Sequence, residues 1–110
     1  MLKLASLAVS RDYGTLKSEQ AIIKSIGGVP TKNSGRSSMG GKGDGIWHQF
    51  CLDVKETAKS FTINKAVWGK ACTDALTHRG KDPLLLVVID GQTRLAVVEL
   101  EILEQLLEEQ

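Results

Sequence analysis

A run of six apolar residues, Leu84 to Ile89, constrains the fold of this 110-residue chain more than any other feature. A continuous apolar run of this length is typical of a strand that is buried on both faces, so other elements must cover the sheet from both sides. Asp90-Gly91 and a second apolar segment over 93–98 follow, and this pattern predicts a hairpin with a type I′ turn. The run is far shorter than the roughly 20 residues of a membrane span, so we expect no membrane partner.

Helical and strand patterns around this hairpin alternate along the chain. The predicted elements are a helix over 15–26, which Gly27-Gly28 ends, strands over 47–57 and 60–63, a helix over 65–79, which Asn64 caps, and a helix over 99–109. The apolar stripe of the second helix is expected to comprise Val67, Trp68, Ala71, Cys72, Ala75 and Leu76. The order of helix, two or three strands, helix, two strands and helix predicts one domain, 1–110, of the α/β (α+β) class. Its central mixed β-sheet is flanked by helices.

The charges are distributed unevenly along the chain. Residues 1–98 contain all 14 basic residues and eight of the 13 acidic ones, which gives this part a net charge of +6. The other five acidic residues crowd the last dozen positions. An acidic terminal helix on a basic body is compatible with binding a polyanion on one side, although many solvated surfaces have the same composition.

Cys51 and Cys72 stand in apolar patterns, without a Cys-x-x-Cys pair or a histidine at zinc spacing. We interpret both as structural thiols. The apolar segment 1–9 lacks a small-residue cleavage site, which argues against a signal peptide and favours a buried strand or short helix. A reducing, cytoplasmic location is therefore expected.

Two carboxylates and a lysine form the pattern that carries chemistry. Along a strand, Asp53 and Lys55 project from the same face about 7 Å apart, while Val54 points the other way. Taken alone, such a pair is most simply an exposed ion pair. Asp44, however, ends the glycine-rich segment nine residues before Asp53, and a tight turn between them brings both carboxylates together. Two carboxylates and the backbone carbonyl of Val54 are the hard oxygen ligands that Mg²⁺ prefers.

This pattern resembles the PD-(D/E)xK nuclease motif, and its surroundings resemble the Holliday junction resolvases of the archaeal and phage type. The features that carry the resemblance are Glu19 in the first helix, Asn33-Ser34-Gly35-Arg36, Lys42-Gly43-Asp44, Cys51-Leu52-Asp53-Val54-Lys55, Ser60-Phe61-Thr62-Ile63, Trp68 and residues 84–98. They span about 15–107. The bare motif is short and widespread, whereas the ordered series is considerably more specific.

The resemblance implies a restriction-endonuclease-like core and a Mg²⁺-dependent endodeoxyribonuclease, in which Mn²⁺ substitutes for Mg²⁺. Asp44, Asp53 and the Val54 carbonyl would bind the metal, Glu19 would complete its shell directly or through water, and Lys55 would be catalytic. The alternative for Glu19 is an ordinary solvated helix acid. The chain departs from this branch in two places: it has Asp53 where Glu is more common, and Glu56 follows Lys55 where a small hydroxyl residue is more common.

A glycine- and serine-rich segment precedes Asp44 and supplies cations and hydroxyl groups suited to phosphate contact. The expected DNA contacts are Lys32, Ser34, Arg36 and Lys42, and the alternative is a solvated loop. We interpret His48 as a packed or half-exposed residue rather than a substrate contact. Trp68 is interpreted as a core or interface residue.

The expected substrate is a branched, four-way DNA junction, resolved by paired phosphodiester hydrolysis. A junction has near two-fold symmetry, so a domain with one active site is expected to act as a homodimer, through the exposed side of the Trp68 helix or through the final strand or helix. Two alternatives remain: a nuclease of the same superfamily that acts on flaps, nicks or duplex, and a non-catalytic DNA-binding or assembly module. The presence of Asp44, Asp53 and Lys55 together argues against the module. The expected setting is the cytoplasm of a bacterial, archaeal or phage-infected cell.

Overall fold

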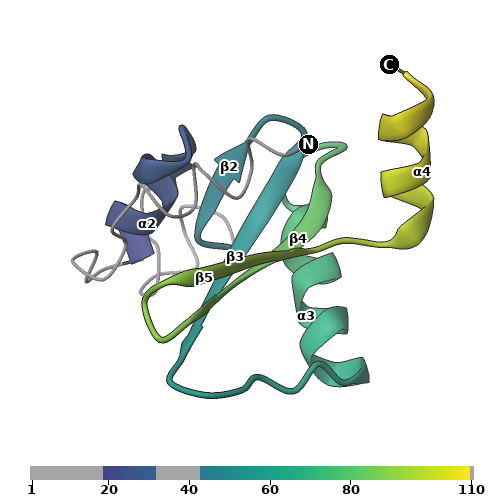
Figure 1. Cartoon of the computed structure of the whole chain (residues 1–110). Helices are drawn as coiled ribbons and strands as arrows, with labels where there is room; N and C mark the ends of the chain where they lie inside the picture. The colour runs from purple at the N-terminus through teal and green to yellow at the C-terminus, as the bar shows by residue number, and fades with distance from the viewer. Residues whose placement is uncertain (1–18, 32–42, 110) are drawn as a thin grey trace.

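A five-stranded mixed sheet forms the centre of the molecule in a computed structural model, which describes residues 19–31 and 43–109 (Figure 1). The elements are α2 (Glu19–Ser25), β1 (Val29–Pro30), β2 (Gly45–Trp47), β3 (Phe50–Thr57), α3 (Lys65–Leu76), β4 (Asp82–Ile89), β5 (Thr93–Val97) and α4 (Leu100–Glu108). The strands lie in the order β1-β2-β3-β4-β5; β3 and β4 pair in parallel, and the other three pairings are antiparallel. The predicted α+β class, mixed sheet and order of elements are therefore confirmed.

Apolar layers bury both faces of the two central strands, as the run in β4 predicted. On one face, Ile22 and Ile23 of α2 pack with Leu52, Val54, Leu84, Leu86 and Val88, and Ile102 and Leu106 of α4 lie against this layer. On the other face, Ala71 of α3 packs with Leu85 and Val87. Each fully buried leucine contributes about 2 kcal/mol relative to an exposed one. Successive residues of β3 therefore point alternately toward α2 and α3.

Turn and cap residues end the elements where the sequence predicted. Gly27, with φ of 90°, ends α2: its N–H donates to Lys24 O and the N–H of Gly28 donates to Ile23 O, which is the Schellman arrangement. Asn64 caps α3 by accepting the N–H of Val67 at 2.8 Å. Asp90 and Gly91 both have positive φ, as a type I′ turn requires.

Three predictions about local structure were wrong. The strand expected over 47–57 is divided into β2 and β3 by a turn at His48-Gln49, because His48 takes a φ of 53° and lets Trp47 pair with Phe50. Residues 60–63 form no strand and lead directly into α3. Helix α3 ends at Leu76, three residues earlier than predicted. Its buried face also differs from the predicted stripe, because Leu76 is 82% exposed, whereas Asp74 is only 3% exposed. The buried face of α3 therefore follows Ala71, Asp74 and Ala75, at the i, i+3, i+4 spacing of one helix face.

None of the helices in the described ranges is long and apolar enough to cross a membrane. Both cysteines are free thiols, Cys51 buried in β3 and Cys72 half-buried in α3.

Candidate active site

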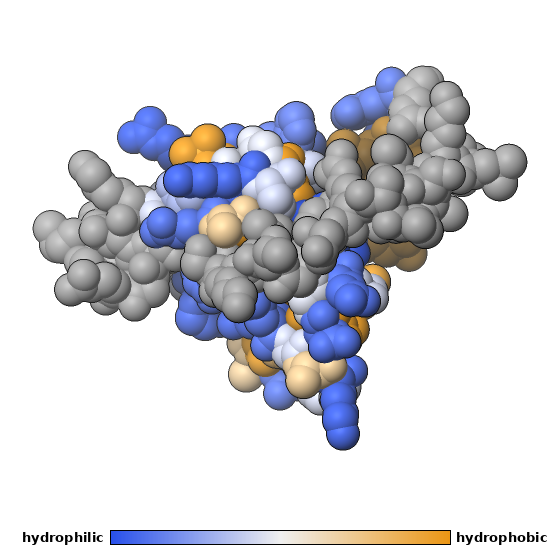
Figure 2. All heavy atoms as spheres, turned by 60° about the vertical axis from the view of Figure 1, so that its left-hand side comes forward, coloured by the Kyte–Doolittle hydropathy of each residue, from blue (hydrophilic) through white to orange (hydrophobic). Residues whose placement is uncertain are grey.

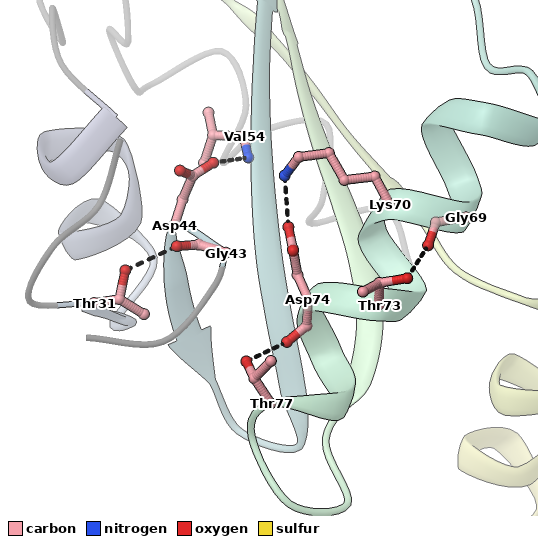
Figure 3. A network of polar contacts seen from close by, with 9 residues as sticks. All are labelled: Thr31, Gly43, Asp44, Val54, Gly69, Lys70, Thr73, Asp74 and Thr77. Carbon is pink, nitrogen blue, oxygen red and sulfur yellow. Dashed lines mark hydrogen bonds and ion pairs between the residues drawn. The ribbon is translucent and has the colours of Figure 1, made fainter. Parts of the chain in front are cut away.

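Asp44 is held in place by its neighbours on both sides at the point where β2 begins. Its backbone N–H donates to Leu52 O at 2.8 Å, and its carbonyl accepts the N–H of Thr31 at 3.0 Å. Thr31 also donates its hydroxyl to Gly43 O at 2.8 Å. The Asp44 carboxylate accepts the N–H of Val54 at 2.7 Å (Figure 3). These contacts fix both the backbone and the side chain of Asp44 before any ligand arrives.

Asp53 lies beside Asp44 across the β2–β3 ladder. The paired register ends at Gly45 opposite Leu52, and Asp44 bonds on either side of Asp53: its backbone N–H donates to Leu52 O, and its carboxylate accepts the N–H of Val54. Asp53 is 4% exposed, and its Oδ2 atom has no hydrogen-bond partner among the described residues. Burial, followed by the charge of Asp74 and, more weakly, that of Asp44, raises the pKa of Asp53 to about 6. Asp53 is therefore a desolvated carboxylate among other carboxylates.

Lys55 follows Asp53 on the same face of β3 and is half-buried. Its positive charge opposes the rise in the pKa of Asp53 and of Glu19, so its ammonium is within electrostatic reach of both acids. The predicted alternation of Asp53, Val54 and Lys55 along one strand is confirmed, because Val54 packs in the layer under α2.

Glu19 begins the described part of α2 and lies close to Asp44. Burial, the charge of Asp44 and a side-chain hydrogen bond with Asp44 raise the pKa of Glu19, and Glu56 adds to this rise. A carboxyl that shares a hydrogen bond with another carboxyl favours the protonated form. Glu19 and Asp44 thus form a second close acid pair.

Glu19 belongs to the helix that covers the Val54 face of β3, whereas strand alternation directs Asp53 toward the α3 face. Asp44, at the end of β2, is the neighbour that both acids share. Strand alternation places Glu56 on the opposite face of β3 from Asp53, and its charge contributes to the raised pKa of Glu19.

Sequence analysis missed two charged residues of α3 beside Asp53. Asp74 is buried and binds Lys70 through an ion pair of 2.7 Å, and Figure 3 shows the Lys70 side chain reaching from α3 toward β3. The charge of Asp74 is the largest electrostatic cause of the raised pKa of Asp53. The signal in the sequence was the i, i+4 spacing of Lys70 and Asp74 next to Ala71 and Ala75, but an acidic residue on an apolar helix face is not expected to be buried.

Four carboxylates and two lysines thus gather around β3: Glu19, Asp44, Asp53, Asp74, Lys55 and Lys70. When all are ionised, their formal charge is −2. The excess of negative charge and the unpartnered Oδ2 atom of Asp53 fit a divalent cation with oxygen ligands.

Across the described residues, no three acidic, histidine or cysteine side chains lie in an arrangement that could hold a metal. This result is compatible with Mg²⁺, which commonly takes one or two protein carboxylates and completes its shell with water and substrate phosphate. The Val54 carbonyl points to the same side of β3 as its N–H, toward Asp44, because both backbone groups of a strand residue face the same neighbour.

The structure describes only some of the remaining residues that the sequence analysis singled out. Lys32, Ser34, Arg36 and Lys42 lie outside the described residues. His48 is exposed at the β2–β3 turn, at the far end of the hairpin from Asp44, and stacks edge-on against Trp47. Trp68 is half-buried on the layer under α3.

The face presented in Figure 2 is mostly hydrophilic where it is coloured, with hydrophobic side chains in separate small groups. A surface of this kind suits a polar or charged partner better than an apolar one.

Comparison of the chain with known protein families, with curated proteins and with solved structures gives no match.

Proposed function

We propose that the chain is a metal-dependent DNA endonuclease that cuts branched, four-way junctions. The observation that carries this proposal is that Asp44 bonds to Leu52 and Val54, the two residues that flank Asp53, with Lys55 next on the Asp53 face of β3. Two carboxylates and an ammonium at one point are the minimum apparatus for metal-assisted phosphodiester hydrolysis.

Each residue has a distinct role in this proposal. Asp44 and Asp53 hold the metal, the Val54 carbonyl adds a neutral oxygen, and Glu19 acts through water bound to Asp44. A bound Mg²⁺ supplies charge neutralisation at the phosphate and lowers the pKa of the attacking water. Lys55 places its ammonium beside that water and orients it toward phosphorus. The hydrogen bonds that fix Asp44 keep the carboxylate from having to reorganise when the phosphate arrives.

The arrangement of elements supports a restriction-endonuclease-like core. A helix bearing Glu19 is followed by three antiparallel strands, a helix and a parallel strand, which is the same order as the features of the resolvase resemblance. Asp53 lies on the central strand β3, and Asp44 directly precedes β2. A site on such strands is held more firmly than one on loops.

The proposed substrate requires two copies of the chain, because resolving a junction needs two opposed cuts and each domain carries one site. Helix α4 offers a surface for the second copy. Its leucines Leu100, Leu103 and Leu107 are exposed by 68%, 43% and 59%, while Ile102 and Leu106 pack inward. The acidic residues of α4 flank these leucines, and the basic remainder of the second copy complements them.

The test is incubation with a labelled four-way junction and with linear duplex of the same sequence, with and without Mg²⁺. The expected result is Mg²⁺-dependent, symmetric nicks about the branch point that ligase can seal, with much slower cutting of duplex. A mixed dimer with one Asp53→Asn subunit is expected to nick one strand of the pair. A monomer that cuts duplex as readily as junctions contradicts the resolvase and leaves a nuclease for other DNA structures. Junction binding without any cutting in Mg²⁺ or Mn²⁺ favours the non-catalytic module.

A further inference from the structure

A buried carboxylate of α3, that of Asp74, lies within electrostatic reach of the buried carboxylate of Asp53. Asp74 is 3% exposed and Asp53 is 4% exposed, and the Oδ2 atom of Asp53 has no hydrogen-bond partner among residues 19–31 and 43–109. Two desolvated carboxylates side by side are unfavourable unless a positive charge lies between them. We propose that Asp53 and Asp74 together bind a divalent cation, so that the metal lies on the α3 face of β3.

Lys70 forms an ion pair with Asp74, but its single positive charge balances only one of the two carboxylate charges. Its ammonium binds the Oδ2 atom of Asp74 at 2.7 Å, while its side chain is 65% exposed and that of Asp74 is 4% exposed. The long, exposed side chain can swing into solvent, whereas the two carboxylates cannot leave the interior. A divalent cation entering the site therefore competes with Lys70 for Asp74.

The two groups proposed as ligands are both carboxylates. Carboxylate oxygens are hard ligands that favour Mg²⁺ or Mn²⁺.

Gly43 brings this acid pair close to Asp44. A Cβ atom on Gly43 would lie 2.6 Å from Cys51 Sγ and 3.8 Å from Asp74 Cβ. The chain next to Asp44 therefore runs directly against α3, and the Asp53–Asp74 pair adjoins Asp44. The cation proposed here is the one of the proposed function, on which this inference rests for its catalytic purpose. In this refinement Asp53 and Asp74 are the two direct carboxylate ligands, and Asp44 and Glu19 act on the cation through bound water, because no three acidic side chains of the described residues are arranged to hold a metal together.

The test is calorimetric titration of Mn²⁺ into the full chain without DNA, comparing wild type with Asp74→Asn, Lys70→Met and Asp82→Asn. Asp74→Asn is expected to lower Mn²⁺ affinity by about 10- to 100-fold, the range for losing a supporting group of a metal site. Lys70→Met breaks the same ion pair but removes a competing cation, so its affinity is expected to equal or exceed that of wild type. Asp82→Asn is the matched control: Asp82 is half-buried and accepts a hydrogen bond from Gln49 at 3.1 Å, away from the acid cluster.

Equal loss of affinity in Asp74→Asn and Lys70→Met overturns the inference, because the pair then only supports the fold. Unchanged affinity in Asp74→Asn, or an equal loss in Asp82→Asn, also overturns it. If Asp74→Asn fails to fold, Mn²⁺ added to the wild-type protein is expected to broaden the amide resonances of Lys70 to Asp74. Broadening confined to α2 overturns the inference.

The inference and the proposed function fail separately. A wild-type protein that cuts junctions in Mg²⁺, while Asp74→Asn keeps full Mn²⁺ affinity, contradicts the inference alone. A protein that binds Mn²⁺ through Asp74 but cuts no DNA contradicts the proposed function alone.

Discussion

The Asp44 carboxylate accepts the backbone N–H of Val54 at 2.7 Å. Strand β2 begins at Gly45, so β3 has no β2 backbone beyond Leu52 with which to pair. The Asp44 side chain satisfies the N–H of Val54 in place of a strand partner, as a buried donor requires. One contact thus satisfies a backbone donor of β3 beyond the end of β2 and fixes the Asp44 carboxylate next to the residue that follows Asp53.

Replacement of either central carboxylate is expected to abolish cleavage while leaving junction binding largely intact. Asp44→Asn keeps an oxygen that can accept the N–H of Val54, so the fold is retained, but the charge that holds a cation is lost. Affinity for DNA comes mainly from phosphate contacts by cations and is therefore little affected. Cleavage assays in Mg²⁺ and gel-shift titrations in Ca²⁺ measure the two properties. Near wild-type cutting by either Asp44→Asn or Asp53→Asn rules out the proposed metal ligands.

Lys55→Ala is expected to lose most of the cleavage activity and to keep Mn²⁺ binding. The ammonium of Lys55 lies near the carboxylates as a charge rather than as a ligand, so its loss affects orientation of the water more than metal affinity. Single-turnover cleavage and calorimetric titration of Mn²⁺ separate the two effects. Lys59→Ala, at an exposed position just after β3, is the control. An unfolded Lys55→Ala protein would instead assign Lys55 a structural role.

Stability in the absence of metal is expected to fall as the pH rises from about 4 to about 6. The folded-state pKa of Asp53 is about 6, against 3.8 for an unperturbed aspartate. Below pH 4 both folded and unfolded states hold the proton, and above pH 6 the folded state must bury the charge. The unfolded state therefore binds fewer protons over this window, and the loss is on the order of 3 kcal/mol.

Urea unfolding in EDTA at several pH values measures this effect. Asp53→Asn lacks the buried charge, so it is expected to be more stable than wild type at pH 7 and to match it near pH 4. Parallel curves for the two proteins across the whole range contradict a buried, ionisable Asp53.

Gly43→Ala is expected to destabilise the protein by roughly 1–3 kcal/mol and to reduce cleavage. Gly43 has a φ of 82°, and an added Cβ would meet Cys51 Sγ at 2.6 Å. Relief of this contact must move the chain that carries Asp44. Gly69→Ala is the matched control, because Gly69 lies inside α3 with nothing within 4 Å of the new Cβ.

For Gly69→Ala we expect a gain of about 0.5–1 kcal/mol from the better helix propensity of alanine. Urea titration of both variants measures the difference. A gain of stability in both means that the Gly43 segment is free to adjust, and that it does not hold Asp44 against α3.

The basic segment before Asp44 yields a prediction from sequence alone, since Lys32, Arg36 and Lys42 lie outside the described residues. Replacing all three by Ala is expected to weaken junction binding regardless of sequence. It should also flatten the plot of log affinity against log salt by about 0.9 for each lost contact. Lys81→Ala is the control, because Lys81 binds His48 O at 2.8 Å, at the far end of the β2–β3 hairpin. An unchanged slope leaves the segment without a DNA role.

The sequence by itself determined the order of most elements and anticipated the turn that brings Asp44 close to Asp53 and Lys55. Local chemistry was sufficient for this: a doubly buried run predicted β4, Asn64 predicted a cap, Gly27 predicted an end, and Asp90-Gly91 predicted a turn. These signals depend on backbone geometry and on neighbours close in sequence, so they are readable without the fold. The hairpin that brings Asp44 beside Asp53 was anticipated as a turn, although its residues were taken for part of a strand.

Only the tertiary structure decided which acids share a face. Strand alternation places Asp53 toward α3, but the sequence does not reveal that α2 covers the opposite face, so the side of β3 on which Glu19 lies could not be predicted. The burial of Asp74 could not be predicted either, because an acidic residue on a helix is ordinarily solvated. Its burial depends on how α3 is rotated against β3 and β4, and that rotation is set by the packing of Ala71 on Leu85 and Val87.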